Sequence, residues 1–156
     1  MANPVLQSFT EGTYTTSVNH TGILPAGLAE GDLMIGWLST GNNAGYTIPT
    51  ITQGWTVLEW NTDWSGAMSL LAYKIATGSE VAPVVTLETS RNTRLFIYRI
   101  TGFDSAVVPV FASQGNSSSI AHIVINPAST SISDALVLRL SRIAVFAPVT
   151  ITSVPA

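Results

Sequence analysis

Two histidines are the first residues that could take part in acid–base chemistry. His20 lies in a predicted loop, and His122 alternates with apolar neighbours in a predicted strand. A catalytic triad would need His122 beside an acid such as Asp134 and a serine nucleophile. The chain has 17 serines, so such a coincidence is expected by chance, and no Gly-x-Ser-x-Gly elbow supports it. We therefore interpret His122 as a hydrogen-bonded strand residue and predict no catalytic residue.

The best group of carboxylates and aromatic rings surrounds a predicted hairpin tip at residues 61–66. Glu59 and Asp63 flank this tip, beside Trp60 and Trp64. An aromatic face can stack on a sugar ring while carboxylates bind its hydroxyl groups, so Trp60, Asp63 and Trp64 could contact a glycan. Tryptophan is also enriched at protein interfaces. We favour a packing or interface role for these residues and keep the glycan contact as the alternative.

The residue types also argue against metal and cofactor chemistry. There is no cysteine, which excludes disulfides, a thiol nucleophile and a cysteine zinc site. No run of alternating aspartates suggests a calcium loop, and no Gly-x-x-x-x-Gly-Lys loop suggests phosphate binding. The sequence predicts a protein that is not an enzyme and that has no metal site and no cofactor.

The elements that must position these residues are short strands. Apolar and polar residues alternate over short runs broken by Gly, Pro, Asn and Ser, and no segment keeps the 3.6-residue period of a helix. The predicted strands are 4–9, 14–19, 32–40, 55–61, 67–75, 84–88, 94–101, 107–112, 120–125, 135–140 and 143–152. A tight turn is predicted at Arg91 and Asn92.

Turn signals recur about every 8–12 residues, which is the spacing of a sandwich or barrel. We predict one domain over residues 1–156 with an all-β fold, an antiparallel and jelly-roll-like β-sandwich with little or no helix. The strand 32–40 is apolar on both faces and should be central. The predicted core consists of Leu33, Ile35, Trp37, Trp55, Leu71, Tyr73, Phe96, Tyr98, Leu136 and Leu138.

The charge of the chain limits its partners. Charged residues make up only 10% of the sequence, and the net charge is −3. The arginines and the single lysine do not form the basic stripe that nucleic-acid binding needs. No apolar run approaches the ~20 residues that span a bilayer, and residues 1–10 lack the features of a secretion signal. We expect no nucleic acid and no membrane among its partners, and synthesis in a cytoplasm.

Both terminal segments are nearly uncharged. Residues 143–156, which follow Arg142, contain no charged side chain. A strand this apolar would pair with other strands if it lay at an open edge of a sheet. Either this strand is central in a sheet or another chain covers it. We predict that 143–156 is an exchanged terminal strand, that 1–10 is an amino-terminal arm, and that both contact other subunits. The predicted contact residues are Val5, Leu6, Phe9, Val145, Phe146, Val149 and Ile151.

Seven short fragments follow one another along the chain. They are LPAG at 24–27, EGDL at 30–33, GWTVL at 54–58, AYKIA at 72–76, GSE at 78–80, RITGFD at 99–104 and SDALVLRL at 133–140. In this order they resemble a β-sandwich domain of bacteriophage virion proteins, found in capsid decoration (cement) proteins and in tail-associated proteins. Such domains usually continue through a further loop and one or two strands. This chain closes soon after Leu140, so a neighbour's strand could complete its sheet.

The resemblance implies a fold more firmly than a function. It implies a capsid decoration protein on the virion surface, made in the host cytoplasm. Its implied partners are the major capsid protein and further copies of itself, as a homotrimer, because decoration proteins of this kind often sit at three-fold capsid positions. The alternative is a tail or fibre module that binds host glycans through the hairpin that carries Trp60 and Trp64.

Overall fold

The computed structural model describes residues 3–41, 47–62, 68–103, 105, 110–114, 120–125 and 136–141. Within these ranges the chain is all-β, and every strand pair is antiparallel. This confirms the all-β, antiparallel fold that the sequence predicts. The described ranges contain no helix that is long and apolar enough to cross a membrane.

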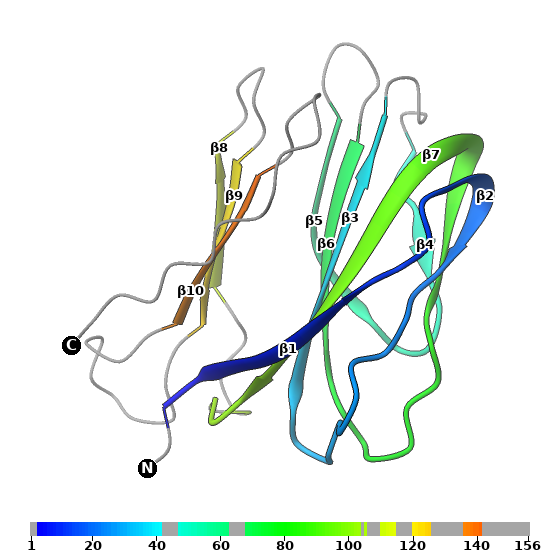
Figure 1. Ribbon diagram of the computed structural model, residues 1–156. Helices are drawn as coiled ribbons and strands as arrows, with labels where there is room; N and C mark the ends of the chain where they lie inside the picture. Colours follow the sequence, from blue (N-terminus) through cyan, green and yellow to red (C-terminus); the bar gives the residue numbers. More distant parts are fainter. Residues whose placement is uncertain are drawn as a thin grey trace.

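The described strands form two sheets (Figure 1). The larger sheet has seven strands, in the order β1-β7-β3-β6-β5, with β2 and β4 also paired to β7, and the smaller has the order β10-β9-β8. The strands are β1 Val5–Glu11, β2 Thr15–Thr21, β3 Leu33–Thr40, β4 Thr50–Ile51, β5 Thr56–Thr62, β6 Met68–Ile75, β7 Val84–Thr101, β8 Val110–Gln114, β9 Ile120–Ile125 and β10 Leu136–Ser141.

β3 lies at the centre of the larger sheet, as its two apolar faces predict. It pairs with β6 and with β7 without a break in register. Ile35 and Trp37 are buried on one face, and Met34 and Leu38 are buried on the other. A strand that is buried on both faces requires a packed layer on each side of its sheet.

One of these layers is the smaller sheet, which packs against the larger sheet through β10 (Figure 1). The two sheets share a cluster of buried side chains, which we call the first core. It consists of Leu33, Ile35, Trp37, Leu71, Tyr98, Ile100, Leu136, Leu138 and Leu140. Seven of the ten predicted core residues belong to it. Tyr73 and Phe96, which were also predicted, pack against it while partly buried.

The other layer is the first half of β7 with β2 and β4. Val85 and Leu87 of β7 are buried together with Leu38 of β3 and Leu70 of β6, in a cluster that we call the second core. Residues 84–93 of β7 pair with β2, and residues 93–100 pair with β3. β7 therefore belongs to two layers, and Figure 1 shows it bending from one to the other.

Trp55 is buried on the same face as the second core, in a third cluster with Met34, Ala72 and Ile97. A Cβ at Gly36 would lie 3.0 Å from the Trp55 ring. Glycine on β3 therefore makes room for the indole. The prediction that Trp55 is buried is confirmed, although it does not face the first core.

The predicted turn at Arg91 and Asn92 is wrong, because both residues lie within β7. They stand opposite Ser17 and Thr16 of β2. The Thr16 hydroxyl donates a hydrogen bond to Asn92 Oδ1, and the Asn92 carbonyl accepts one from the Gly41 amide at 3.1 Å. Hydrogen-bond partners on both sides therefore keep this polar segment extended, although its sequence predicts a turn.

Other boundaries differ by smaller amounts. β2 continues through His20, which was placed in a loop, because its backbone pairs with Val85. β8 covers Val110–Gln114 where residues 107–112 were predicted, and the two-residue β4 was not predicted. The predicted strand 143–152 lies outside the described residues.

Candidate functional site

Of the three residues predicted at the hairpin tip, the structure describes Trp60. Trp60 lies on β5 and packs, partly buried, against the second core. Asp63 and Trp64 lie outside the described residues. Trp60 therefore supports the core of its own subunit, and a glycan contact at this hairpin stays a prediction.

The predicted contact residues of the amino-terminal segment lie on β1, which pairs with β7 of its own chain. Val5 and Phe9 are 49% and 54% exposed, whereas Leu6 packs, partly buried, against the first core. Their role in a contact between subunits stays a prediction. The remaining predicted contact residues, Val145, Phe146, Val149 and Ile151, lie outside the described residues.

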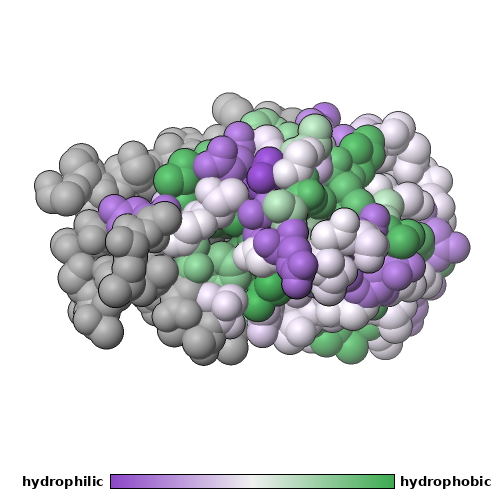
Figure 2. All heavy atoms as spheres, turned by 90° about the horizontal axis from the view of Figure 1, so that it is seen from below, coloured by the Kyte–Doolittle hydropathy of each residue, from purple (hydrophilic) through white to green (hydrophobic). Residues whose placement is uncertain are grey.

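Exposed apolar side chains concentrate in this part of the chain. Of the large apolar side chains that are exposed among the described residues, most lie on β1, on β2 or next to them. These are Val5, Phe9, Tyr14, Val18 and Ile23, and we call them the amino-terminal apolar edge. In the view of Figure 2, apolar surface appears in several patches between polar ones. Contiguous apolar exposure marks partner surfaces, so these five residues are the candidates for a contact surface among the described residues.

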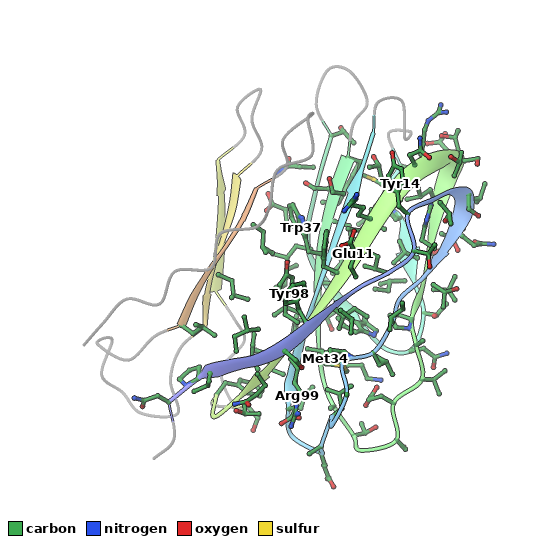
Figure 3. All side chains as sticks on the ribbon, viewed as in Figure 1. Glu11, Tyr14, Met34, Trp37, Tyr98 and Arg99 are labelled. Carbon is green, nitrogen blue, oxygen red and sulfur yellow. The ribbon has the colours of Figure 1, made fainter. Side chains whose placement is uncertain are left out.

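Phe9 connects this edge to the first core. Its ring centre lies 5.8 Å from that of Tyr98, and the Tyr98 ring lies 6.4 Å from that of Phe96. These separations are typical of favourable aromatic pairs. Figure 3 shows Tyr98 on the side of the larger sheet that faces β10. Burial, and secondly the charge of Glu11, raise the pKa of the Tyr98 hydroxyl far above its usual value, so it stays neutral.

An exposed charged pair lies next to this aromatic row. Arg94 Nη1 of β7 lies 2.5 Å from Glu11 Oε1 of β1, and the Arg94 guanidinium lies 5.3 Å from the centre of the Tyr14 ring. The side chains of Arg94 and Glu11 are 38% and 39% exposed, so solvent screens their attraction. The pair therefore helps to align β1 with β7 but contributes little to the free energy of folding.

A more buried ion pair lies at the other end of the sheet, near Met34 in Figure 3. Arg99 Nε of β7 donates to Asp32 Oδ2 at 2.7 Å, and Arg99 Nη1 donates to the Ala26 carbonyl at 3.3 Å. Asp32 Oδ2 also accepts a hydrogen bond from the Ala29 amide at 2.9 Å. These bonds hold the loop at residues 24–31 against β7.

A second buried ion pair stands beside it. Lys74 Nζ lies 2.5 Å from Glu80 Oε2, and Glu80 Oε1 accepts hydrogen bonds from the amide and hydroxyl of Thr77. Burial alone would raise the pKa of Glu80, but the bonds from Lys74 and Thr77 hold it below its usual value. Lys74 and Arg99 both stand opposite Met34 in register, so the two pairs flank a fully buried methionine.

The histidines do not assemble a catalytic group from the described residues. His20 is buried in β2, where its Nε2 donates to the Ser17 carbonyl at 2.9 Å. Burial lowers the pKa of His20, although the bond to Ser17 opposes this, so the ring is neutral at pH 7. The backbone of His122 pairs with Arg139, and Asp134 lies outside the described residues. No three His, Asp or Glu side chains gather as a metal site within the described ranges.

Sequence reasoning missed these ion pairs, because the partners are far apart along the chain. Arg99 and Asp32 are separated by 67 positions. A usable signal was nevertheless present, since Arg99 interrupts an apolar strand and charged residues are rarely buried without a partner. The side chains of the two buried ion pairs therefore support the framework of the fold. The exposed apolar residues are the candidates for a functional contact.

A scan against models of protein families finds no match to this chain, and searches of the curated proteins and of the solved structures find none either. The function proposed below therefore depends on the residues, their order and their geometry.

Proposed function

We propose that this chain is a structural protein of a bacteriophage virion, a capsid decoration (cement) protein that binds the shell and further copies of itself. The observation that carries the proposal is a contact between two of the fragments that resemble the virion domain. Asp32 comes from the fragment at 30–33 and Arg99 from the fragment at 99–104, and their side chains form the buried ion pair. The fragments that resemble the virion domain thus supply its framework contacts.

The second ion pair supports the same interpretation. Lys74 belongs to the fragment at 72–76 and Glu80 to the fragment at 78–80. Lys74 and Glu80 bind each other and the Thr77 backbone and hydroxyl. The role of the two ion pairs is to fix loops 24–31 and 76–80 at one end of the larger sheet, which is the role expected of a scaffold rather than of an enzyme.

A decoration protein works through binding energy alone. Many copies, each with a modest interface to the major capsid protein, stabilise the assembled shell over the opened one by mass action. A weakly charged surface with an amino-terminal apolar edge suits such contacts. The proposal includes a homotrimer on the capsid surface, synthesis in the host cytoplasm, no enzymatic activity, no cofactor, and no nucleic acid or membrane partner.

The test is the location of the protein in virions. Purified particles would be analysed by mass spectrometry and by electron cryomicroscopy, and the purified protein would be added to shells that lack it. We expect copies bound to the outer capsid surface and a higher temperature of shell rupture. Recovery with isolated tails, or absence from particles, would overturn the proposal.

The alternative, a tail or fibre module for host glycans, rests on the hairpin that carries Trp60. The packing of Trp60 against the second core leaves one of the three predicted glycan contacts only partly exposed. A glycan array with the purified protein distinguishes the two functions, since a decoration protein should bind none of the glycans.

A further inference from the structure

The outer strands of the larger sheet are poorly suited to accept another strand. Each of the three long ones has a register shift in its pairing with the strand inside it. The shifts lie between Leu6 and Ser8 in β1, between Ser17 and Asn19 in β2, and between Val57 and Glu59 in β5. β4, which among the described strands pairs only with β7, has two residues. Bulges and short edge strands are features that prevent edge-to-edge pairing.

The smaller sheet has no such protection among its described residues. β8 and β10 flank β9, and both pair with it in continuous register over their full lengths. β10 is also firmly anchored, because Leu136, Leu138 and Leu140 are buried in the first core. A regular, anchored strand with no second neighbour among the described strands is a template for strand addition.

The sequence that follows β10 has the character of a strand. It contains Ile143, Val145, Phe146, Val149 and Ile151, with no charge after Arg142. Residues 135–147 contain no Gly, Pro, Asn or Asp, whereas a tight two-residue hairpin depends on such residues. The sequence therefore disfavours a tight turn that would return this segment to the edge of its own β10.

We propose that the edge of β10 that has no neighbour among the described strands binds a β-strand from a second copy of this chain, and that the donated strand is residues 143–152. Each copy then offers one edge and one strand, and the exchange closes under cyclic symmetry. Main-chain hydrogen bonds supply the affinity, which suits a chain with few charges. The inference rests on the self-association within the proposed function, but not on the location in a virion.

The absence of cysteine allows a direct test. One tagged chain carries Arg139→Cys on β10. A chain with a different tag carries Ile143→Cys, Val145→Cys or Val149→Cys, so that the panel covers different registers. The two chains are refolded together and oxidised, and the products are separated without reductant. We expect a disulfide between the two tags in at least one combination, because cross-strand neighbours lie within disulfide distance.

The matched control replaces Arg139→Cys by Thr16→Cys on the bulged edge of β2, and we expect no linked product there. Light scattering on the unmodified chain at micromolar concentration should report an oligomer. A monomer, or the absence of a linked product in every combination of the panel, would overturn the inference. Linked chains that are absent from virions would instead overturn the proposed function and leave this contact standing.

Discussion

Arg99 and Asp32 meet through a 2.7 Å bond between the guanidinium Nε and a carboxylate oxygen, although 67 positions separate them in the sequence. The bond joins the start of the central strand β3 to the end of β7. It also fixes the loop at residues 24–31, since the same two side chains bind the backbone of Ala26 and Ala29.

Asp32→Ala should therefore lower the free energy of unfolding by about 2–3 kcal/mol, because the partly buried Arg99 guanidinium loses its partner. Asp32→Asn keeps an oxygen for the Ala29 amide and should cost less. Urea unfolding of the three proteins measures the difference. Equal stability of Asp32→Ala and the unmodified chain would show that the pair is solvated.

Gly27 offers a test of the same loop. It has a φ of 72°, and a Cβ there would lie 2.9 Å from Arg99 Nη1. Gly54 has a φ of 71° and no atom within 4 Å of such a Cβ, so it is the matched control. Both substitutions to alanine strain the backbone. Gly27→Ala should cost about 1 kcal/mol more than Gly54→Ala, because it also displaces Arg99. Equal losses in urea unfolding would contradict the packing of Arg99 over the loop.

Trp55→Ala should lower the free energy of unfolding by about 3–5 kcal/mol, because the ring is only 7% exposed and fills space above Gly36. The indole nitrogen has no hydrogen-bond partner among the described residues. Trp55→Phe should therefore cost much less, since it removes volume without breaking a polar contact. A loss below about 1 kcal/mol for Trp55→Ala would mean that the site is solvated.

His20 should make stability depend on pH. Its folded-state pKa lies below the unfolded value of 6.5, so the unfolded chain binds more protons in this range. The contribution of His20 is complete above this value and is lost as the pH falls below it. Glu80, whose pKa is also lowered from 4.5, adds a loss only at more acidic pH. Urea unfolding at about pH 7.5 and about pH 5 measures the change.

His20→Gln is the control for this prediction, because glutamine can donate to the Ser17 carbonyl without titrating. His122 is present in both proteins, so its contribution cancels. The substituted chain should lose less stability between the two pH values. Parallel losses would assign the pH dependence to other groups.

Removal of metal ions should leave the melting temperature unchanged, because the sequence contains no recognisable ligand set. Thermal unfolding with and without a chelator measures this. A clear decrease would identify an oxygen-ligand site, and Asp63 and Asp104, which lie outside the described residues, would be the first residues to replace.

Much of the fold could be predicted because alternation directly reports which side of a strand is buried. The apolar faces of residues 32–40 indicated a central strand, and Leu33, Ile35 and Trp37 lie in the first core as expected. Alternation does not report which strands pair. It therefore could not reveal that β2 holds Asn92 extended, or that Arg99 reaches Asp32.

The candidate site was less predictable for the same reason. Trp60 was recognised as an unusual aromatic residue near a hairpin, but whether it faces solvent or the core depends on the fold of β7 over β6. Phe9 was predicted to contact another subunit because the amino-terminal segment is nearly uncharged, and that stays a prediction. Its contact with Tyr98 could not be predicted, because it depends on the register of β1 on β7.

Among the described strands, β1 and β2 pair only with β7, and this has a consequence for biosynthesis. The first two strands leave the ribosome early, but their partner is complete only when Thr101 has been added. At roughly 5–20 residues per second, the amino-terminal strands wait for several seconds without the neighbour that satisfies their backbone. The larger sheet can close only after Thr101 has been added, so Val5 and Phe9 are accessible to chaperones on the nascent chain before the folded protein presents them to partners.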